Sequence, residues 1–229
     1  LGDVYKRQEY SAKLPALALL CNLGWEFLSP EQALSARAGK SDEVVLRNVL
    51  REQLAKRRFL FGGNEYPLSP KAIDNLVNEV CSPALNEGLM AANERLYNHL
   101  LYGISVTEFV DGKKASPTVA LIDWHNPANN SFIFTEEFRV LRSGGVEARR
   151  PDIVCFVNGI PLVVIEAKRP DGNAQKGPTI DEGVSQSLRN QRHDEIPKLF
   201  AYSQLLLSIN GSDGRYACLL YTSPSPRDK

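Results

Sequence analysis

The chain has 229 residues, of which 43% are hydrophobic and 24% charged. This composition fits one large globular domain with a sizeable core, and it excludes a disordered chain. No apolar run approaches the roughly 20 residues that a membrane span needs. Lysine plus arginine and aspartate plus glutamate both number 27, so the net charge is zero and any contact with nucleic acid must be local.

The cysteines and glycines exclude two further classes of site. The four cysteines lie far apart with no CxxC or Cys/His spacing, which argues against a zinc site or a disulfide framework and favours a reducing, intracellular setting. The chain has no Gly-x-x-x-x-Gly-Lys-Ser/Thr loop. Gly62-Gly63 is isolated, so we expect a turn there and no nucleotide site.

The two ends of the chain differ from the sequence between them. Residues 1–8 (LGDVYKRQ) and 218–229 (CLLYTSPSPRDK) resemble translated sequencing-adaptor tails, and the second is rich in serine and proline. We expect both to be non-native tails around a domain at 9–217. On this interpretation the native segment was cut from a longer reading frame.

Residues 9–102 carry mostly helical patterns. Apolar residues recur at helical spacing in four segments, which predict helices over 9–23, 41–58, 69–83 and 89–101. Ser41 is the expected N-cap of the second helix, and Ser69-Pro70 marks the start of the third. The N-terminal half is therefore predicted to be largely helical.

From residue 103 to 217 the pattern changes to short β-rich runs separated by turn signals. They predict strands over 104–110, 118–122, 131–141, 153–157, 162–167 and 205–209. Asn158-Gly159 is the strongest hairpin signal in the chain, so 153–157 and 162–167 should pair antiparallel.

Two helices are expected between the last strands. Thr179 to Glu182 forms a capping box, and Ile180, Val184 and Leu188 recur every fourth residue, so this face should pack on the sheet. A short helix is expected over 196–202. The predicted fold class is α/β (α+β), with a mixed sheet flanked by helices.

Two carboxylates and a lysine lie at the predicted strands 153–157 and 162–167. Asp152 precedes the first strand, and Glu166 and Lys168 share one face of the second because side chains alternate along a strand. Asp152 and Glu166, with the Ala167 backbone carbonyl as a third ligand, suit Mg²⁺. Lys168 suits the attacking water or the developing charge of a phosphoryl-transfer reaction. A solvated surface pair of Glu166 and Lys168 is the competing interpretation, and the bare pattern favours it.

The wider context reverses that preference. The stretch 149–170 (RRPDIVCFVNGIPLVVIEAKRP) closely resembles the nuclease motif of the restriction subunit of type I restriction–modification systems, a PD-(D/E)xK family. The resemblance extends to NNSFIFTEEFRV at 129–140 and to LGWEF at 23–27, and it covers 9–216. It implies a restriction-endonuclease-like fold and a Mg²⁺-dependent DNA endonuclease domain of a larger, ATP-driven translocase whose motor is not in this sequence.

The resemblance also implies partners and further site residues. Double-stranded DNA and the methylation and specificity subunits are the implied partners, in a bacterial or archaeal cytoplasm. The family carries a Gln-x-x-x-Tyr motif that is thought to position the site and contact DNA. Gln186 fits it, but Asn190 stands at the tyrosine position. The residues expected to contact DNA are Arg149, Arg150, Arg169, Gln186 and Asn190.

The hairpin makes a geometric prediction. A regular two-residue Asn158-Gly159 turn would place Asp152 opposite Ile165, and Glu166 would then lie on the other face. A shared metal therefore requires a three-residue loop or a bulge after Gly159, which Pro161 favours because it cannot donate a ladder hydrogen bond. We expect such an irregularity.

Three functions are compatible with these observations. A metal-dependent nuclease domain, with Asp152, Glu166, Lys168 and Gln186 as its catalytic set, is the leading hypothesis. A DNA-binding or assembly module that has lost the chemistry is the second, and Asn190 leaves it open. The third is a free-standing repair or recombination nuclease. We expect that replacing Asn190 by the family's tyrosine leaves cleavage equal or raises it.

Overall fold

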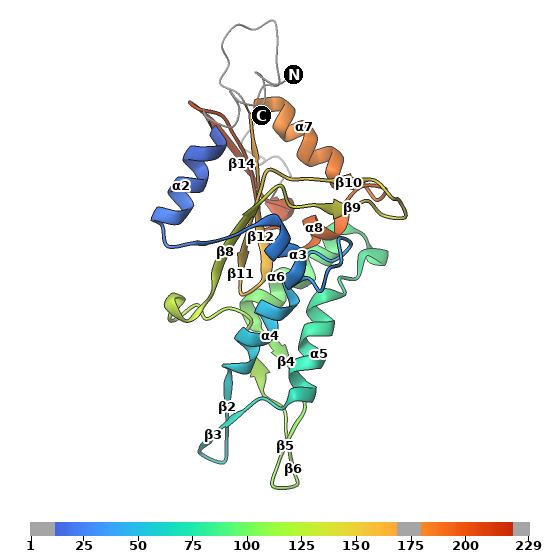
Figure 1. Cartoon of the computed structure of the whole chain (residues 1–229). Coiled ribbons are helices and arrows are strands. Elements are labelled where there is room, and N and C mark those ends of the chain that lie inside the picture. The colour runs from blue at the N-terminus through green and yellow to red at the C-terminus, as the bar shows by residue number, and fades with distance from the viewer. Residues whose placement is uncertain (1–11, 169–179, 222–229) are drawn as a thin grey trace, which may run out of the picture.

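A six-stranded mixed sheet forms the centre of the domain (Figure 1). The computed structural model describes residues 12–168 and 180–221. The strand order is β1 (Glu26–Leu28), β8 (Phe132–Glu136), β11 (Ile153–Val157), β12 (Ile160–Ala167), β13 (Leu205–Ile209) and β14 (Gly214–Ala217). The pairs β1/β8 and β12/β13 are parallel and the other pairs are antiparallel. The predicted mixed sheet is confirmed.

The other strands form four small antiparallel pairs. They are β2 (Arg58–Phe61) with β3 (Asn64–Pro67), β4 (Ile104–Ser105) with β7 (Thr118–Val119), β5 (Glu108–Val110) with β6 (Lys113–Ala115), and β9 (Val140–Leu141) with β10 (Ala148–Arg149). Gly62-Gly63 is the turn between β2 and β3, as the sequence predicts. The three strands expected between residues 104 and 141 are divided into shorter pieces.

Helices flank the sheet and fill most of the N-terminal half. They are α2 (Leu14–Asn22), α3 (Pro30–Ala36), α4 (Arg47–Ala55), α5 (Pro70–Cys81), α6 (Leu89–Tyr102), α7 (Ile180–Asn190) and α8 (Pro197–Tyr202), with short 3₁₀ turns η2 (Leu85–Glu87), η3 (Pro127–Asn129) and η4 (Leu219–Tyr221). Within the described residues, no helix is long and apolar enough to cross a membrane.

Two of the predicted N-terminal helices are confirmed by their caps. The Ser69 hydroxyl accepts a hydrogen bond from the Ala72 amide, and α6 follows Gly88. The sequence analysis missed α3, although Ser29 and Gln32 form a capping box there. The division into a helical half and a sheet half is not strict, because β1 joins the main sheet next to β8.

The helix predicted over 41–58 is wrong in its first part. Val44, Val45 and Leu46 are all fully buried, and three consecutive residues cannot face the same side of a helix. They instead form an irregular segment, and the Leu46 amide donates to the Gly159 carbonyl over 2.8 Å. The helix therefore begins at Arg47, and Ser41 is not its cap.

The turn of the central hairpin is anchored inside the domain. Asn158 and Gly159 have φ angles of 52° and 83°, the left-handed conformation that an Asn-Gly hairpin turn requires. The Asn158 side chain is buried, and it accepts from the Ser131 amide and donates to the Leu121 carbonyl, each over 2.8 Å. These contacts fix the turn end of the β11/β12 hairpin, which is the end far from Asp152 and Glu166.

The two faces of the sheet bury different side chains. Val154, Phe156 and Val164 belong to the large core shared with the N-terminal helices. Their sequence neighbours Ile153, Cys155 and Ile165 belong to a smaller cluster, against which Ala16, Leu17 and Leu20 of α2 pack. In Figure 1, α2 and α7 lie on opposite sides of the sheet.

The face of α7 that packs on the sheet differs from the predicted one. Ile180 is buried, but Val184 and Leu188 are 36% and 60% exposed. Gly183, Ser187 and Asn190 are the other buried residues. A side chain at Gly183 would overlap the Ser208 hydroxyl of β13, so the absence of a Cβ lets the helix lie close to the strand. Thr179 of the expected capping box lies outside the described residues.

Candidate active site

A bulge in β12 brings the two acidic residues together. Val157 pairs with Ile160 and Phe156 with Pro161, but Cys155 pairs with Val163, so Leu162 is the extra residue. Beyond the bulge, Ile153 pairs with Ile165, and continuing this register by one residue places Asp152 opposite Glu166. Opposed residues share a face of a sheet. The predicted bulge is confirmed, and the turn itself is the regular two-residue turn.

One amide side chain connects the acid and the lysine. Gln186 of α7 donates its Nε2 to Glu166 Oε2 over 2.8 Å, and its Oε1 accepts from Lys168 Nζ over 2.9 Å. Lys168 Nζ lies 3.7 Å from the same Glu166 oxygen. The structure thus brings together three of the residues that the sequence analysis selected: Glu166 in β12, Lys168 just after β12, and Gln186 in α7.

Glu166 is held in an environment that disfavours its charge. The residue is 1% exposed, and burial, followed by the charge of Asp152, raises its pKa to about 8 against the attraction of Lys168. Its Oε1 atom is buried and has no hydrogen-bond partner in the described part of the chain. A buried oxygen without a donor lacks the cation or proton that would compensate its desolvation.

Asp152 has a more mixed environment. Its Oδ2 accepts the Ala167 amide over 2.8 Å. Burial raises its pKa above the usual value, with a further contribution from Glu137, although the Ala167 amide and the charge of Lys168 act in the opposite direction. The Glu137 amide donates to the Asp152 carbonyl, so this third carboxylate residue lies beside Asp152, just after the end of β8.

Two acidic residues at the end of β8 form ion pairs with Lys13, which precedes α2. Lys13 Nζ lies 2.8 Å from Glu136 Oε2 and 2.8 Å from Glu137 Oε1. Burial lowers the pKa of Lys13, but these hydrogen bonds outweigh it and leave the pKa raised. Lys13 precedes α2, so the ion pairs attach the start of this helix beside Asp152.

The carboxylate pair suits a hard divalent cation. Asp152 and Glu166 supply oxygen atoms, and burial raises the pKa of both groups, with a further contribution from the charge of Asp152 at Glu166. Among the described residues, no three His, Cys, Asp or Glu side chains form a ready-made metal cluster. Such a cation would therefore need water, backbone or substrate oxygens to complete its coordination.

The residues expected to contact DNA differ in how accessible they are and in whether their charge is already paired. Arg149 is committed to Glu195, with its Nε and Nη2 atoms 2.6 and 2.7 Å from the two carboxylate oxygens. Arg150 is exposed, Asn190 is only 1% exposed, and Arg169 lies outside the described residues. Glu195 thus neutralises a charge that the sequence analysis expected to be available for phosphate.

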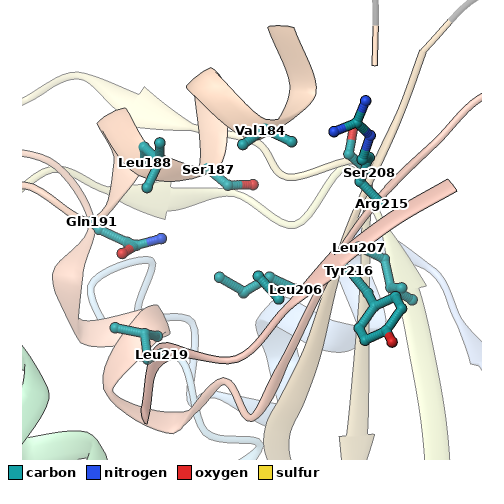
Figure 2. A pocket seen from close by; sticks show the side chains of 11 residues that line it. Val184, Ser187, Leu188, Gln191, Leu206, Leu207, Ser208, Arg215, Tyr216 and Leu219 are labelled. Atoms are coloured by element: carbon teal, nitrogen blue, oxygen red, sulfur yellow. The ribbon is translucent and has the colours of Figure 1, made fainter. Parts of the chain in front are cut away.

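A separate apolar pocket lies behind α7. Its volume is about 300 Å³, and it is lined by Val184, Ser187 and Leu188 of α7, and by residues of β13, β14 and η4. Figure 2 shows Leu206 and Leu219 across the hollow from the α7 side chains. Neither Asp152 nor Glu166 lines it. Val184 and Leu188 are therefore exposed to this pocket, which is distinct from the acidic site.

The sequence analysis missed Arg189 and Lys13 as neighbours of the site. The charge of Arg189 opposes the rise in the pKa of Glu166, and the charge of Lys13 opposes the rise in the pKa of Asp152. Arg189 could have been found from its spacing, because it lies three residues after Gln186 and thus on nearly the same helix face. Lys13 had no such signal, since only tertiary packing brings it to β8.

A mixed sheet that brings Asp152, Glu166 and Lys168 to the ends of its two central strands has the arrangement of a restriction-endonuclease-like domain. The chain belongs to the family described as Type I restriction enzyme R protein N terminus, whose model matches residues 6–224. This match overlaps both of the end segments that resemble adaptor tails.

Known restriction-enzyme subunits are similar along most of the chain. The Type I restriction enzyme HindI endonuclease subunit of Haemophilus influenzae is 30% identical over 210 residues, which cover 89% of this chain and 18% of that protein. A Methanocaldococcus jannaschii protein named "Putative type I restriction enzyme MjaIXP endonuclease subunit" is 25% identical over 228 residues, covering 94% of this chain and 20% of the relative. The chain thus spans a fifth or less of the length of these relatives.

Proposed function

We propose that this domain is a Mg²⁺-dependent DNA endonuclease that hydrolyses phosphodiester bonds of foreign DNA as part of a type I restriction enzyme. The observation that carries the proposal is the buried Glu166 carboxylate, which lies close enough to Asp152 to feel its charge and next to Lys168, and whose Oε1 has no partner in the described structure. A buried carboxylate oxygen without a donor destabilises the fold, and a cation bound to that oxygen would compensate its desolvation.

Each residue has a role that follows from its position. Asp152 and Glu166, with the Ala167 carbonyl, would hold the cation. When bound, the cation would polarise the scissile phosphate and lower the pKa of a coordinated water. Lys168 Nζ would donate to the attacking water or to the phosphate oxygen on which charge grows. Gln186 would keep Lys168 and Glu166 in register, since its amide contacts both.

The proposed reaction is a hydrolysis. The water oxygen forms a bond to phosphorus, one phosphorus–oxygen ester bond breaks, and the leaving oxygen takes up a proton. Double-stranded DNA is the proposed substrate. Methylation and specificity subunits are the proposed partners, and ATP is the proposed fuel of a motor elsewhere in the whole protein. The names of the relatives support the assignment to a type I restriction enzyme. The partners, the fuel and a cytoplasmic setting are proposed from the family resemblance.

The principal alternative is a module of the same fold that binds DNA or partners without cutting. Asn190 at the position of the family tyrosine is the feature that favours it. Against it, Gln186 contacts both Glu166 and Lys168, and Asp152 accepts the neighbouring Ala167 amide, so all four residues are present at one place. A free-standing nuclease is disfavoured because the similar proteins are long restriction-enzyme subunits.

The test uses the full-length protein assembled with its partner subunits. Glu166→Gln and Lys168→Ala should each abolish Mg²⁺-dependent cleavage of unmodified DNA while the circular dichroism spectrum stays unchanged. Glu94→Gln and Lys71→Ala make the same charge changes at exposed helix positions and should cleave normally. Normal cleavage by the Glu166 or Lys168 variant would refute the catalytic assignment, and no cleavage by the folded, unsubstituted protein would favour the binding module.

A further inference from the structure

Arg189 lies on the same helix as Gln186 and close to the acidic pair. It is an exposed residue in the last turn of α7, three positions after the glutamine that contacts Glu166. Residues three positions apart are neighbours on a helix surface, and the charge of Arg189 opposes the rise in the pKa of Glu166. The guanidinium group therefore lies at the margin of the proposed nuclease site.

The Arg189 side chain is held by its neighbour. Asn190 is 1% exposed, and its Oδ1 accepts from Arg189 Nε over 3.3 Å and from Nη2 over 3.1 Å. The Asn190 carbonyl accepts the Ile196 amide over 3.1 Å, which fixes the backbone at the end of α7. A buried, fixed acceptor that holds one edge of a planar guanidinium group restricts its direction and leaves the remaining N–H groups free to donate.

Arg189 forms no ion pair within the described ranges, whereas Arg149 and Arg142 both contact Glu195. The charge of Arg189 contributes to the lowered pKa of Glu195, but less than the charges of Arg149 and Arg142. An oriented guanidinium group without a carboxylate partner, next to a site for phosphodiester hydrolysis, has the chemistry that recognises a phosphate with two parallel N–H donors.

We propose that Arg189 binds a DNA phosphate at the nuclease site, and that the buried Asn190 is the positioning residue that directs it there. This proposal rests on the proposed endonuclease function and extends it to the substrate contacts. It gives Asn190 a role that differs from the aromatic contact expected of the family tyrosine, because the Asn190 amide orients Arg189 and does not touch the DNA itself. The ligand atoms are the non-bridging oxygens of the scissile or the adjacent phosphate.

The first experiment removes the charge in the full-length protein within its complex. Arg189→Ala should lower the single-turnover cleavage rate about 100-fold, as expected for loss of one transition-state donor. Added guanidinium ion should restore part of the rate to this variant and none to Glu166→Gln. Arg192→Ala is the matched control, because Arg192 is exposed just beyond α7 and forms no ion pair in the described structure. An unchanged rate for Arg189→Ala overturns the proposal.

A double-mutant cycle tests the positioning role of Asn190. Asn190→Ala should slow cleavage in the otherwise unsubstituted protein, but it should have little further effect when Arg189 is already alanine. If the fold-losses in rate of the two single variants multiply in the double variant, Asn190 acts independently of Arg189. That outcome would overturn its role as a positioning residue. Thermal unfolding of each variant is the second readout. A lower melting temperature for Arg189→Ala together with no guanidinium rescue would show a structural role and would also overturn the proposal.

DNA binding separates this proposal from the proposed function. If the unsubstituted complex does not cleave, the endonuclease function fails, but the phosphate contact is still measured by affinity. Arg189→Ala should then weaken DNA binding and reduce the slope of log affinity against log salt by about 1, as for one lost phosphate contact. An unchanged affinity and slope would refute the contact, and Arg192→Ala again supplies the comparison.

Discussion

Gln186 donates its side-chain amide to Glu166 Oε2 over 2.8 Å and thereby connects α7 to the buried acid of β12. The same side chain accepts a hydrogen bond from Lys168, so its carbonyl and its amino group are each satisfied by a charged or ionisable partner. A glutamine is suited to this position because it carries one acceptor and one donor group on the same planar amide. A helix and two strand-end residues are thus joined at a single point.

The first prediction concerns this connection. Gln186→Ala should lower Mg²⁺-dependent cleavage by about 10- to 100-fold, the usual cost of losing a residue that orients catalytic groups. The reason is that Lys168 loses its acceptor and Glu166 its donor. Single-turnover cleavage by the full-length complex measures the effect. Gln191→Ala, which alters a residue of the apolar pocket, should retain the normal rate; equal losses for both variants would contradict the assignment.

The second prediction concerns pH. The pKa of Glu166 is raised by burial from 4.5 to about 8, so the folded chain holds a proton that the unfolded chain has released. Stability without metal should therefore fall as the pH rises from about 5 to about 8. Urea unfolding in the presence of a chelator measures this. Glu166→Gln should flatten the pH dependence and Glu94→Gln should leave it unchanged, whereas a steep dependence in the Glu166 variant would assign the titration to another group.

Metal binding should show the converse dependence. Because a divalent cation competes with the proton on Glu166, Mg²⁺ affinity should increase as the pH rises toward about 8, and binding near neutral pH should release a proton. Isothermal titration calorimetry in two buffers of different ionisation enthalpy measures the proton release. The Glu166→Gln variant should bind more weakly and release none. A pH-independent affinity would argue against Glu166 as a ligand.

The fourth prediction tests how the hairpin turn is anchored. Gly159 has a φ of 83°, and an added Cβ would lie 2.6 Å from the Leu46 carbonyl oxygen. Gly63 has a nearly identical φ of 85° with nothing within 4 Å of the added atom. Gly63→Ala should therefore cost about 1 kcal/mol for the left-handed backbone alone, and Gly159→Ala about 3 kcal/mol or more because the contact with α4 must also shift. Chemical denaturation compares them, and equal costs would show that the turn is free to move.

The sequence predicted the central hairpin and the bulge that brings Asp152 and Glu166 to one face, because both depend on local chemistry. Asn158-Gly159 specifies its own turn, and Pro161 favours the irregularity that skips Leu162. The start of α4 could not be predicted in the same way. Val44 and Val45 fit a helical pattern, but both are fully buried in an irregular segment whose next residue, Leu46, bonds to the distant Gly159.

The packing of α7 shows a second limit of sequence patterns. The strongest apolar spacing selected Val184 and Leu188, but the helix buries Gly183 and Ser187. Small residues allow the closest approach to a neighbouring strand, and a hydrophobic pattern gives them no weight. The Glu195 pairing of Arg149 was equally invisible, because it depends on a contact between residues 46 positions apart.

The last prediction concerns the tyrosine of the family motif. From the sequence, Asn190→Tyr should leave cleavage equal or raise it, but Asn190 is 1% exposed and anchors Arg189. A tyrosine would remove the acceptor oxygen from that contact and force a larger side chain into a packed site, at a cost of about 1–3 kcal/mol. We therefore now expect Asn190→Tyr to lower both the melting temperature and the single-turnover cleavage rate. Asn190→Ala separates the two causes, since it removes the acceptor without overpacking. Full activity of the tyrosine variant would show that the end of α7 can repack as in relatives that carry the aromatic residue, and that the contact between Arg189 and Asn190 is dispensable.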